Sequence, residues 1–213
     1  MSLLRTRRWL ALALIAGAVL VADQASKFAA VNSLTTLFAD SPEAGIAAKA
    51  RAFVREKDLW ERGLATQPKD VLRSVWQWRY VQNRGAAFDF LARADKKVRV
   101  PFFLILPIAA SIFVLVYFRR TQDHELRTRV ALALLLGGAL GNGLDRVLHG
   151  YVIDFIAWHW FDPTWANPAR HWPTFNVADC GVSIGIALLL LDAVLPKTRT
   201  LDSADPAANA RAA

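Results

Sequence analysis

Four apolar segments constrain this chain more than any other feature. The second, from Val100 to Phe118, runs for 19 residues without a charge. A helix needs about 20 residues to cross the roughly 30 Å hydrocarbon core of a bilayer, so this segment can span a membrane on its own. The other segments reach that length when the polar residues at their ends are included. The sequence therefore predicts a membrane α-helical fold with four spans, at about residues 9–31, 98–118, 129–148 and 177–195.

Composition and charge agree with a membrane protein. The chain is 54% hydrophobic and 21% charged, whereas soluble domains are about 45–50% apolar and about a quarter charged. The net charge of +8 is compatible with binding nucleic acid, but basic residues of a hydrophobic chain more often flank cytoplasmic span ends. The single cysteine, Cys180, excludes an intrachain disulfide framework.

Basic residues also predict how the spans are oriented. Clusters of Arg and Lys precede the first span, fill the link between the second and third, and follow the fourth. Placing these clusters in the cytoplasm puts both termini inside. Lys96, Lys97 and Arg99 adjoin the second span on the other side and count against this orientation. The single membrane domain then has an extracytoplasmic insertion at about 32–97, an extracytoplasmic loop at about 149–175 and a tail at 199–213 that we expect to be disordered.

The first segment has an alternative interpretation. Arg5, Arg7 and Arg8 followed by 14 apolar residues are typical of a cleavable signal peptide. Three further spans follow, and the apolar stretch continues past Asp23. Both observations favour a retained helix.

The extracytoplasmic insertion contains two patterned stretches. Ser41-Pro42-Glu43 is typical of a helix start, and Gly63 is a plausible stop. Between them, apolar and basic residues alternate at helical spacing, which fits either a helix on an anionic membrane surface or one packed on the rest of the loop. Further on, Trp76, Trp78 and Tyr80 alternate with polar residues, which predicts a strand with one aromatic face.

Aspartates at span ends are expensive in a membrane and need an explanation. Asp23 and Lys27 are four residues apart, so they lie on one helix face and an ion pair is the simplest interpretation. Asp145 lies near Asn142, where a polar network and a contact with substrate are equally compatible with the sequence. Asp192 lies at the opposite end of the spans from the other aspartates.

Asp154 and Asp179 differ because neither has a neighbouring Lys or Arg in the sequence. If they meet, two carboxylates share a poorly solvated site, and one of them must hold a proton near neutral pH. Such a pair is the acid and base of an aspartic protease, although a structural pair or a proton relay is also compatible with the spacing. No zinc-protease, serine-hydrolase or phosphate-loop motif is present in the sequence.

Five strings occur in one order along the chain, and together they resemble the bacterial lipoprotein signal peptidase family, also called signal peptidase II. The resemblance covers about Asp23 to Gly185, and the ordered set is specific although each string alone is weak. The strings are Asp23-Gln24-Ala25-Ser26-Lys27, Asn83-Arg84-Gly85-Ala86-Ala87-Phe88, Gly138-Ala139-Leu140-Gly141-Asn142-Gly143-Leu144-Asp145-Arg146, Gly150-Tyr151-Val152-Ile153-Asp154-Phe155 and Phe175-Asn176-Val177-Ala178-Asp179.

The resemblance implies four transmembrane helices with a small extracytoplasmic β-cradle and an extended periplasmic helix or loop. It implies an aspartic endopeptidase of the bacterial inner membrane that removes signal peptides from diacylglyceryl-modified prolipoproteins, cutting before the lipidated cysteine. Membrane lipids are the other expected partner, and neither nucleic acid, metal nor organic cofactor is expected. A monomer and inhibition by globomycin-type cyclic peptides are expected too.

By motif match, the resemblance implies that Asp154 and Asp179 are the catalytic pair. Asn176 is a good helix cap, and the positive start of that helix favours an ionised Asp179. We therefore hypothesise that Asp179 is the initial base and Asp154 its protonated partner. The expected supporting positions in the site are Asn83, Asn142, Arg146, Asn176, Asp23 and Lys27.

Two stretches are longer than is usual in the family and leave substrate access open. One lies between Lys27 and Asn83, where the predicted 41–63 helix accounts for the extra length, and the other is the 156–173 loop. A presenilin-type protease would need Tyr-Asp and Gly-x-Gly-Asp strings inside helices, and neither is present. A proton-coupled transporter would place its carboxylates near the middle of the bilayer, whereas four of these cluster at one interface.

Overall fold

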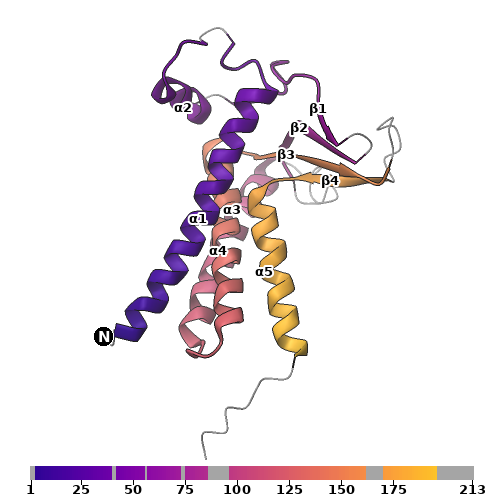
Figure 1. Ribbon diagram of the computed structural model, residues 1–213. Coiled ribbons are helices and arrows are strands. Elements are labelled where there is room, and N and C mark those ends of the chain that lie inside the picture. The colour runs from indigo at the N-terminus through magenta and orange to yellow at the C-terminus, as the bar shows by residue number, and fades with distance from the viewer. Residues whose placement is uncertain are drawn as a thin grey trace, which may run out of the picture.

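The computed structural model describes residues 3–39, 42–55, 57–72, 75–85, 96–161 and 170–195. Within these ranges lie four long apolar helices, a short helix and a four-stranded sheet, which confirms the predicted fold class (Figure 1). The helices are α1 (Leu3–Leu34), α2 (Ile46–Arg55), α3 (Lys96–Arg120), α4 (Leu126–Leu148) and α5 (Val177–Val194). The strands are β1 (Lys69–Leu72), β2 (Trp76–Asn83), β3 (Val152–His159) and β4 (His171–Phe175).

Helix α4 lies at the centre of the bundle and packs against α1, α3 and α5. A Cβ added to Gly138 would lie 2.5 Å from the carbonyl oxygen of Ala178 in α5, and one on Gly137 would lie 2.8 Å from that of Ala16 in α1. Small residues let helices approach this closely in lipid, where the hydrophobic effect does not drive helix association. We call the five glycines packed at the contacts among α1, α4 and α5 the glycine seam: Gly137, Gly138, Gly141, Gly181 and Gly185.

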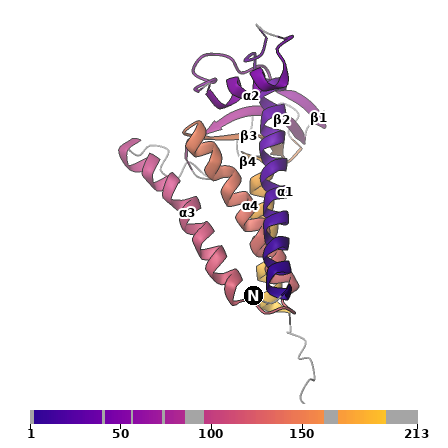
Figure 2. The ribbon, with the colours of Figure 1, turned by 90° about the vertical axis from the view of Figure 1, so that its left-hand side faces the viewer.

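Helix α3 is attached differently from the other long helices. At the end of the bundle away from the sheet, Phe118 packs edge-on against Trp9 of α1, with ring centroids 4.9 Å apart. Toward the sheet, α3 leans away from α1 (Figure 2). An apolar groove of about 410 Å³, lined by residues that include Leu104, Ile108 and Leu140, lies between α3 and α4.

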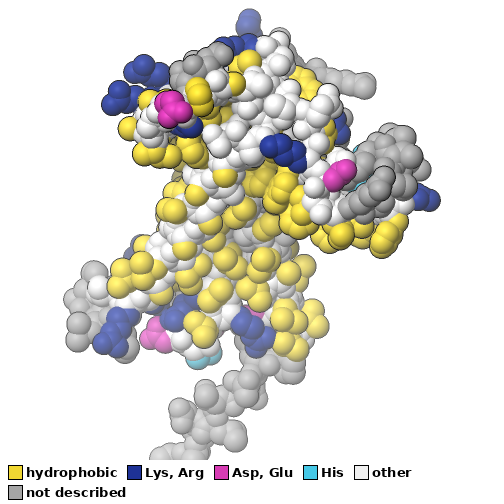
Figure 3. Space-filling view, turned by 45° about the horizontal axis from the view of Figure 1, so that its top comes forward, with side chains coloured by type: hydrophobic (Ala, Val, Ile, Leu, Met, Phe, Trp, Pro, Cys, Tyr) yellow, Lys and Arg dark blue, Asp and Glu magenta, His cyan; other side chains and the backbone are white. Residues whose placement is uncertain are grey.

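The long helices carry an apolar belt. Side chains such as Leu14, Ile108 and Leu190 are exposed along it. In the space-filling view, apolar atoms cover the helices, and Lys and Arg lie toward both ends of the molecule (Figure 3). Helix α5, with 18 residues, is about 27 Å long at 1.5 Å per residue, close to the thickness of a bilayer core. The chain is a multi-pass membrane protein.

The sheet has the order β1-β2-β3-β4, and each neighbouring pair is antiparallel. The predicted aromatic face is wrong for Tyr80, because the register of β2 against β3 shifts just after Trp78. Such a bulge reverses the alternation of side chains beyond it. As a result Tyr80 is buried, with 2% of its surface exposed, and Asn83 reaches Asp154 on β3.

Helix α2 is shorter than the predicted helix from Ser41 to Gly63. Asp58 and Gly63 both have positive φ angles, +55° and +67°, which a continuous right-handed helix does not allow. The ring of Phe53 is buried against Phe28 of α1, with centroids 5.6 Å apart. Phe53 also shares a buried cluster with Phe38 and Leu59 of the insertion. At this residue the helix therefore packs on the rest of the loop, as one alternative predicts, and also on α1.

Several predictions lie outside the described residues. These include Ala86-Ala87-Phe88 of the second string, residues 162–169 of the extended loop and the tail at 199–213. Helix α1 extends beyond the predicted 9–31 span at both ends.

Candidate active site

Asp179 lies in the first turn of α5, where the local sequence fixes its geometry. The Asn176 side chain accepts a hydrogen bond from the Asp179 backbone N–H at 3.0 Å, and the Asn176 backbone N–H donates to Asp179 Oδ2 at 3.1 Å. This reciprocal capping box confirms the predicted helix cap. The other carboxylate oxygen, Oδ1, accepts from the Asn142 amide at 2.8 Å.

Asp154 lies on β3 and is almost completely buried. Its Oδ2 accepts a hydrogen bond from the Asn83 amide at 2.9 Å, and its Oδ1 accepts from the Asn176 amide at 2.7 Å. The bulge in β2 brings Asn83 into reach. Two strands and a helix start therefore converge on one carboxylate.

Asn176 links the two carboxylates. It caps the helix at Asp179 with its oxygen and donates to Asp154 with its nitrogen. The same nitrogen also donates to Asn142 Oδ1 at 3.0 Å. In the parts of the chain that the structure describes, no Lys or Arg forms an ion pair with Asp154 or Asp179. Amides hold the pair, and neither carboxylate is neutralised by a direct cation contact.

A second group of buried charges lies beside this pair. Lys27 Nζ is 2.7 Å from Asp23 and 2.9 Å from Asp145, and all three side chains are fully buried. The ion pair predicted between Asp23 and Lys27 is therefore present, and Asp145 joins it. Lys27 also donates to Asn142 Oδ1 at 3.2 Å, which connects this Lys27 cluster to the asparagines.

The Lys27 cluster holds the backbone next to each member of the carboxylate pair. Asp23 Oδ1 accepts from the backbone N–H of Ala178 at 2.9 Å, one residue before Asp179. Asp145 Oδ2 accepts from the backbone N–H of Ile153 at 2.9 Å, one residue before Asp154. Buried ion pairs are worth keeping only where further hydrogen bonds satisfy them, and these bonds also fix where the pair stands.

Comparison with known proteins bears on what this site belongs to. A family model described as "Signal peptidase (SPase) II" matches residues 15–195. The chain belongs to the signal peptidase II family. A "Lipoprotein signal peptidase" of Anaeromyxobacter sp. (strain Fw109-5) is 38% identical over 205 residues, 96% of this chain and 94% of the relative. Another, of Geobacter sulfurreducens, is 41% identical over 129 residues, 61% of this chain and 75% of the relative.

A solved bacterial membrane enzyme shares the fold of this signal peptidase II family member, with a TM-score of 0.57 and 27% identity over 89% of this chain and 93% of that chain. The family processes the signal peptides of prolipoproteins and is a family of proteases.

The environment of Asp154 raises the pKa of its carboxyl to about 7. Burial is the largest cause, and the nearby charge of Asp179 adds to it. The hydrogen bonds from Asn83 and Asn176 favour the ionised form and work in the opposite direction. A carboxyl of this kind can hold a proton near neutral pH, which is what acid catalysis requires.

Arg146 is the other cation near the site. Its guanidinium donates to the Asn142 carbonyl oxygen at 3.2 Å and lies 5.3 Å above the ring of Phe103. It lines a cleft of about 330 Å³ together with Asn83 and Asp179. Arg146 therefore lies at the wall of the cleft, and asparagine amides donate the hydrogen bonds to the two carboxylates.

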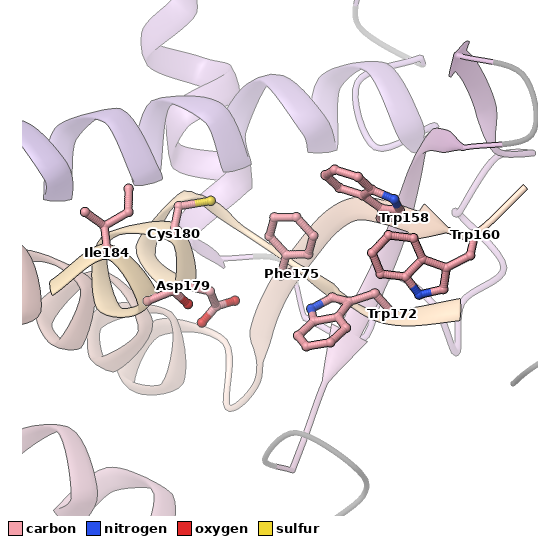
Figure 4. A pocket seen from close by; sticks show the side chains of 8 residues that line it. Trp158, Trp160, Trp172, Phe175, Asp179, Cys180 and Ile184 are labelled. Atoms are coloured by element: carbon pink, nitrogen blue, oxygen red, sulfur yellow. The ribbon is translucent and has the colours of Figure 1, made fainter. Parts of the chain in front are cut away.

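A second cavity of about 470 Å³ adjoins this cleft and shares Trp172, Phe175, Asp179 and Ser183 with it. Its lining is aromatic and aliphatic apart from Asp179, Cys180 and Ser183, and the close-up shows the tryptophans and Phe175 beside Asp179 (Figure 4). The residues that line it are Trp158, Trp160, Trp172, Phe175, Asp179, Cys180, Ser183 and Ile184. Within the described residues, no group of three or more His, Cys, Asp or Glu could hold a metal ion.

The structure brings seven of the eight predicted site residues into one hydrogen-bonded network and places Arg146 at its edge. Two members of this network were not predicted as site residues. Asp145 was weighed as a polar anchor, and Gln24 stands inside the first string, where its amide donates to Asp145 Oδ1 at 2.8 Å. The Trp lining of the second cavity carried no signal in the sequence beyond its composition.

Proposed function

We propose that this chain is an aspartic endopeptidase that removes signal peptides from diacylglyceryl-modified prolipoproteins, cutting before the lipidated cysteine. Family membership supports the protease and its substrate class. The aspartic mechanism rests on one observation: Asp154 and Asp179, from different elements, share the Asn176 side chain in a buried site. Like charges so placed favour a state in which one carboxyl is protonated.

In the first step, ionised Asp179 accepts a proton from a water molecule while the water oxygen attacks the scissile carbonyl carbon. Protonated Asp154 donates its proton to the carbonyl oxygen. The product is a neutral tetrahedral diol, with Asp179 now protonated and Asp154 ionised. The raised pKa of Asp154 supports this assignment of the two roles.

In the second step, Asp179 donates its proton to the scissile nitrogen, and Asp154 accepts a proton from one hydroxyl of the diol. The C–N bond breaks, which leaves a carboxylic acid on the signal peptide and an amine on the lipidated cysteine. Both aspartates return to their starting protonation states. The cleft lined by Asn83, Arg146 and Asp179 is the proposed path of the peptide.

We also propose that the chain lies in the bacterial inner membrane as a monomer, with both termini in the cytoplasm and the carboxylate pair at the periplasmic face. The support is that exposed cations such as Arg119, Arg120 and Arg127 lie at the end of α3 and the start of α4, and the link between these helices is at the opposite end of the bundle from the sheet (Figure 1). Basic residues of short loops favour the cytoplasmic side.

A gel-shift assay tests the function. The purified protein in lipid receives a diacylglyceryl-modified prolipoprotein, beside the variants Asp154→Asn and Asp179→Asn. Each variant should lose about 10³-fold or more of the cleavage rate, because acid and base catalysis each supply about 10²–10⁴-fold. Asp192→Asn is the matched control, since Asp192 accepts from Thr128 at the far end of the bundle, and it should cleave normally. Globomycin should block the reaction. Undiminished cleavage by either site variant would refute the assigned pair.

A further inference from the structure

The sheet extends sideways beyond α5 as an arm made of the outer halves of β3 and β4 (Figure 1). Three tryptophans of this arm, Trp158, Trp160 and Trp172, are 43%, 54% and 54% exposed. Trp158 is in register with Trp172, and its ring centroid lies 5.8 Å from that of Trp160. We call these three residues the Trp face. An exposed patch of large aromatic residues on a protein usually marks an interaction surface.

The direction of the Trp face follows from the strands. Asp154, Ile156 and Trp158 alternate along β3, so they share one face of the sheet. A register shift in the β3–β4 pairing, between Ile156 and Trp158, sets Trp172 and Phe175 opposite these residues. The Trp face therefore lies on the same side of the sheet as Asp154. This side of the sheet is turned toward α5.

Contacts with α5 show the same direction. The Trp face and α5 line the 470 Å³ cavity from opposite sides, and Ile184 stands at its α5 wall (Figure 4). Ile184 lies five residues after Asp179, which is about 7.5 Å further along the helix at 1.5 Å per residue. It is itself exposed and continues into the apolar belt through Ile186 and Leu190.

The chemistry of the arm fits a lipid–water boundary. Tryptophan prefers the interface between acyl chains and headgroups, and arginine beside it keeps its charge near the phosphates. Arg170 is exposed on the arm. Its carbonyl oxygen accepts from the Trp160 backbone N–H at 2.8 Å, which holds this cation next to the Trp face.

We propose that the Trp face docks into the outer interfacial layer of the phospholipid bilayer, and that a lipid acyl chain fills the cavity between it and α5. The docking is continuous with the apolar belt that the bilayer already covers. It holds the membrane boundary level with Asp179. The inference rests on the membrane topology and stands apart from the proposed chemistry.

The test is a depth measurement in protein-containing liposomes of phosphatidylcholine and phosphatidylglycerol. A nitroxide label is attached to the cysteine of a Trp172→Cys variant, in a protein that also carries Cys180→Ser and Asp154→Asn. The matched control carries the label at Asp70. Asp70 is in register with Gln77, and Gln77 with Ala157, one residue before Trp158, so Asp70 lies on the opposite face of the sheet.

The label at position 172 should collide with oxygen at least several-fold more often than with a water-soluble nickel complex, and the label at position 70 should do the reverse. If both labels collide with nickel equally often, the proposal is overturned. A face that docks a partner protein would give this result, because the liposomes contain no other protein. Catalysis plays no part, because the Asp154→Asn background lacks the proposed acid.

A second measurement avoids the label. Brominated phosphatidylcholine should quench a larger fraction of the tryptophan fluorescence of the unsubstituted protein than of a Trp158→Phe, Trp160→Phe, Trp172→Phe variant. Phenylalanine keeps an aromatic ring at each position, so the fold is retained. An equal quenched fraction in the two proteins would overturn the proposal.

Discussion

Two groups of buried carboxylates lie next to each other at the sheet end of the bundle, and they are built differently. Asp23 and Asp145 share the ammonium group of Lys27 at 2.7 and 2.9 Å. Asp154 and Asp179 are held by asparagine amides. A cation compensates buried negative charge, whereas an amide mainly fixes position. In the first group one cation therefore compensates part of the charge of two carboxylates. No ion pair compensates the second group among the described residues, and this group is the one suited to moving a proton.

The two groups are also joined. Asp23 and Asp145 bind the backbone N–H groups that directly precede Asp179 and Asp154. Asn142 accepts from Lys27 and donates to Asp179. The ion-paired group therefore fixes the position of the two carboxylates, and the amides contact these carboxylates without neutralising them. Substitutions at defined positions test this difference between the groups.

Lys27→Met gives the largest expected loss of stability. It leaves Asp23 and Asp145 buried without a cation, and removing one partner of a buried pair costs about 3–5 kcal/mol. Thermal unfolding in detergent measures the change. Lys69→Met, at an exposed lysine of β1, should change the free energy of unfolding by less than about 0.5 kcal/mol.

A triple variant tests whether the loss of stability comes from the uncompensated carboxylate charges. Adding Asp23→Asn and Asp145→Asn to Lys27→Met removes the uncompensated charges, so part of the lost stability should return. Equal stability of Lys27→Met and Lys69→Met would show that the buried cluster does not hold the fold.

Asn142→Ala removes the side-chain link between the two groups and keeps their backbone links. Asp179 loses its amide donor, and a hydrogen bond to a charged group is worth about 1.5–3 kcal/mol. The cleavage rate should fall about 10-fold to 100-fold, with a smaller loss of stability than Lys27→Met. Ser111→Ala in α3 is the control and should cleave normally, since Ser111 donates to the Pro107 carbonyl oxygen of its own helix. A rate unchanged by Asn142→Ala would mean that the connection has no role in catalysis.

Asp154→Asn should change how stability depends on pH. Because the folded pKa of Asp154 is raised to about 7, its contribution to stability is fully present below about pH 4 and is lost as pH rises to about 7. The slope is at most about 1.4 kcal/mol per pH unit. Unfolding measured from pH 4 to 8 should show this decline in the unsubstituted protein and less of it in the variant. Asp70→Asn, at an exposed aspartate, should keep the decline.

Asn83→Ala gives the smallest effect and, of the two aspartates, changes the contacts of Asp154. Its amide favours ionised Asp154, so removing it raises the pKa of Asp154 further. The alkaline limb of the pH–rate profile should move to higher pH, and the maximal rate should fall about threefold to tenfold, since one hydrogen bond is worth about 0.5–1.5 kcal/mol. A shift to lower pH would contradict the assignment of Asp154 as the acid.

Much of the site could be predicted because its residues sit in short strings whose local geometry is self-contained. Asn176 and Asp179 form their capping box within four residues, and Asp23 and Lys27 meet within one helical turn. Both arrangements follow from residue spacing alone. The four spans likewise follow from apolar length.

What the sequence did not predict depends on contacts between distant segments. The bulge that buries Tyr80 and brings Asn83 to Asp154 arises from pairing with β3, 71 residues further on. Asp145 joins Lys27 only because α4 packs on α1. The early end of α2 is a local exception and follows from the backbone turn at Asp58. Periodicity describes one segment at a time and carries no register between segments.

The glycine seam has a genetic consequence. Every missense change of one base in a glycine codon adds a Cβ, and at Gly141 that atom would lie 2.6 Å from the Asp23 carboxylate. Gly17 and Gly45 have open space in the same position. Selection should therefore remove almost all such variants from the codons of the glycine seam, whereas variants at Gly17 and Gly45 should persist. Populations carrying this gene would show the contrast as silent substitutions alone at one set of glycines and amino-acid polymorphism at the other.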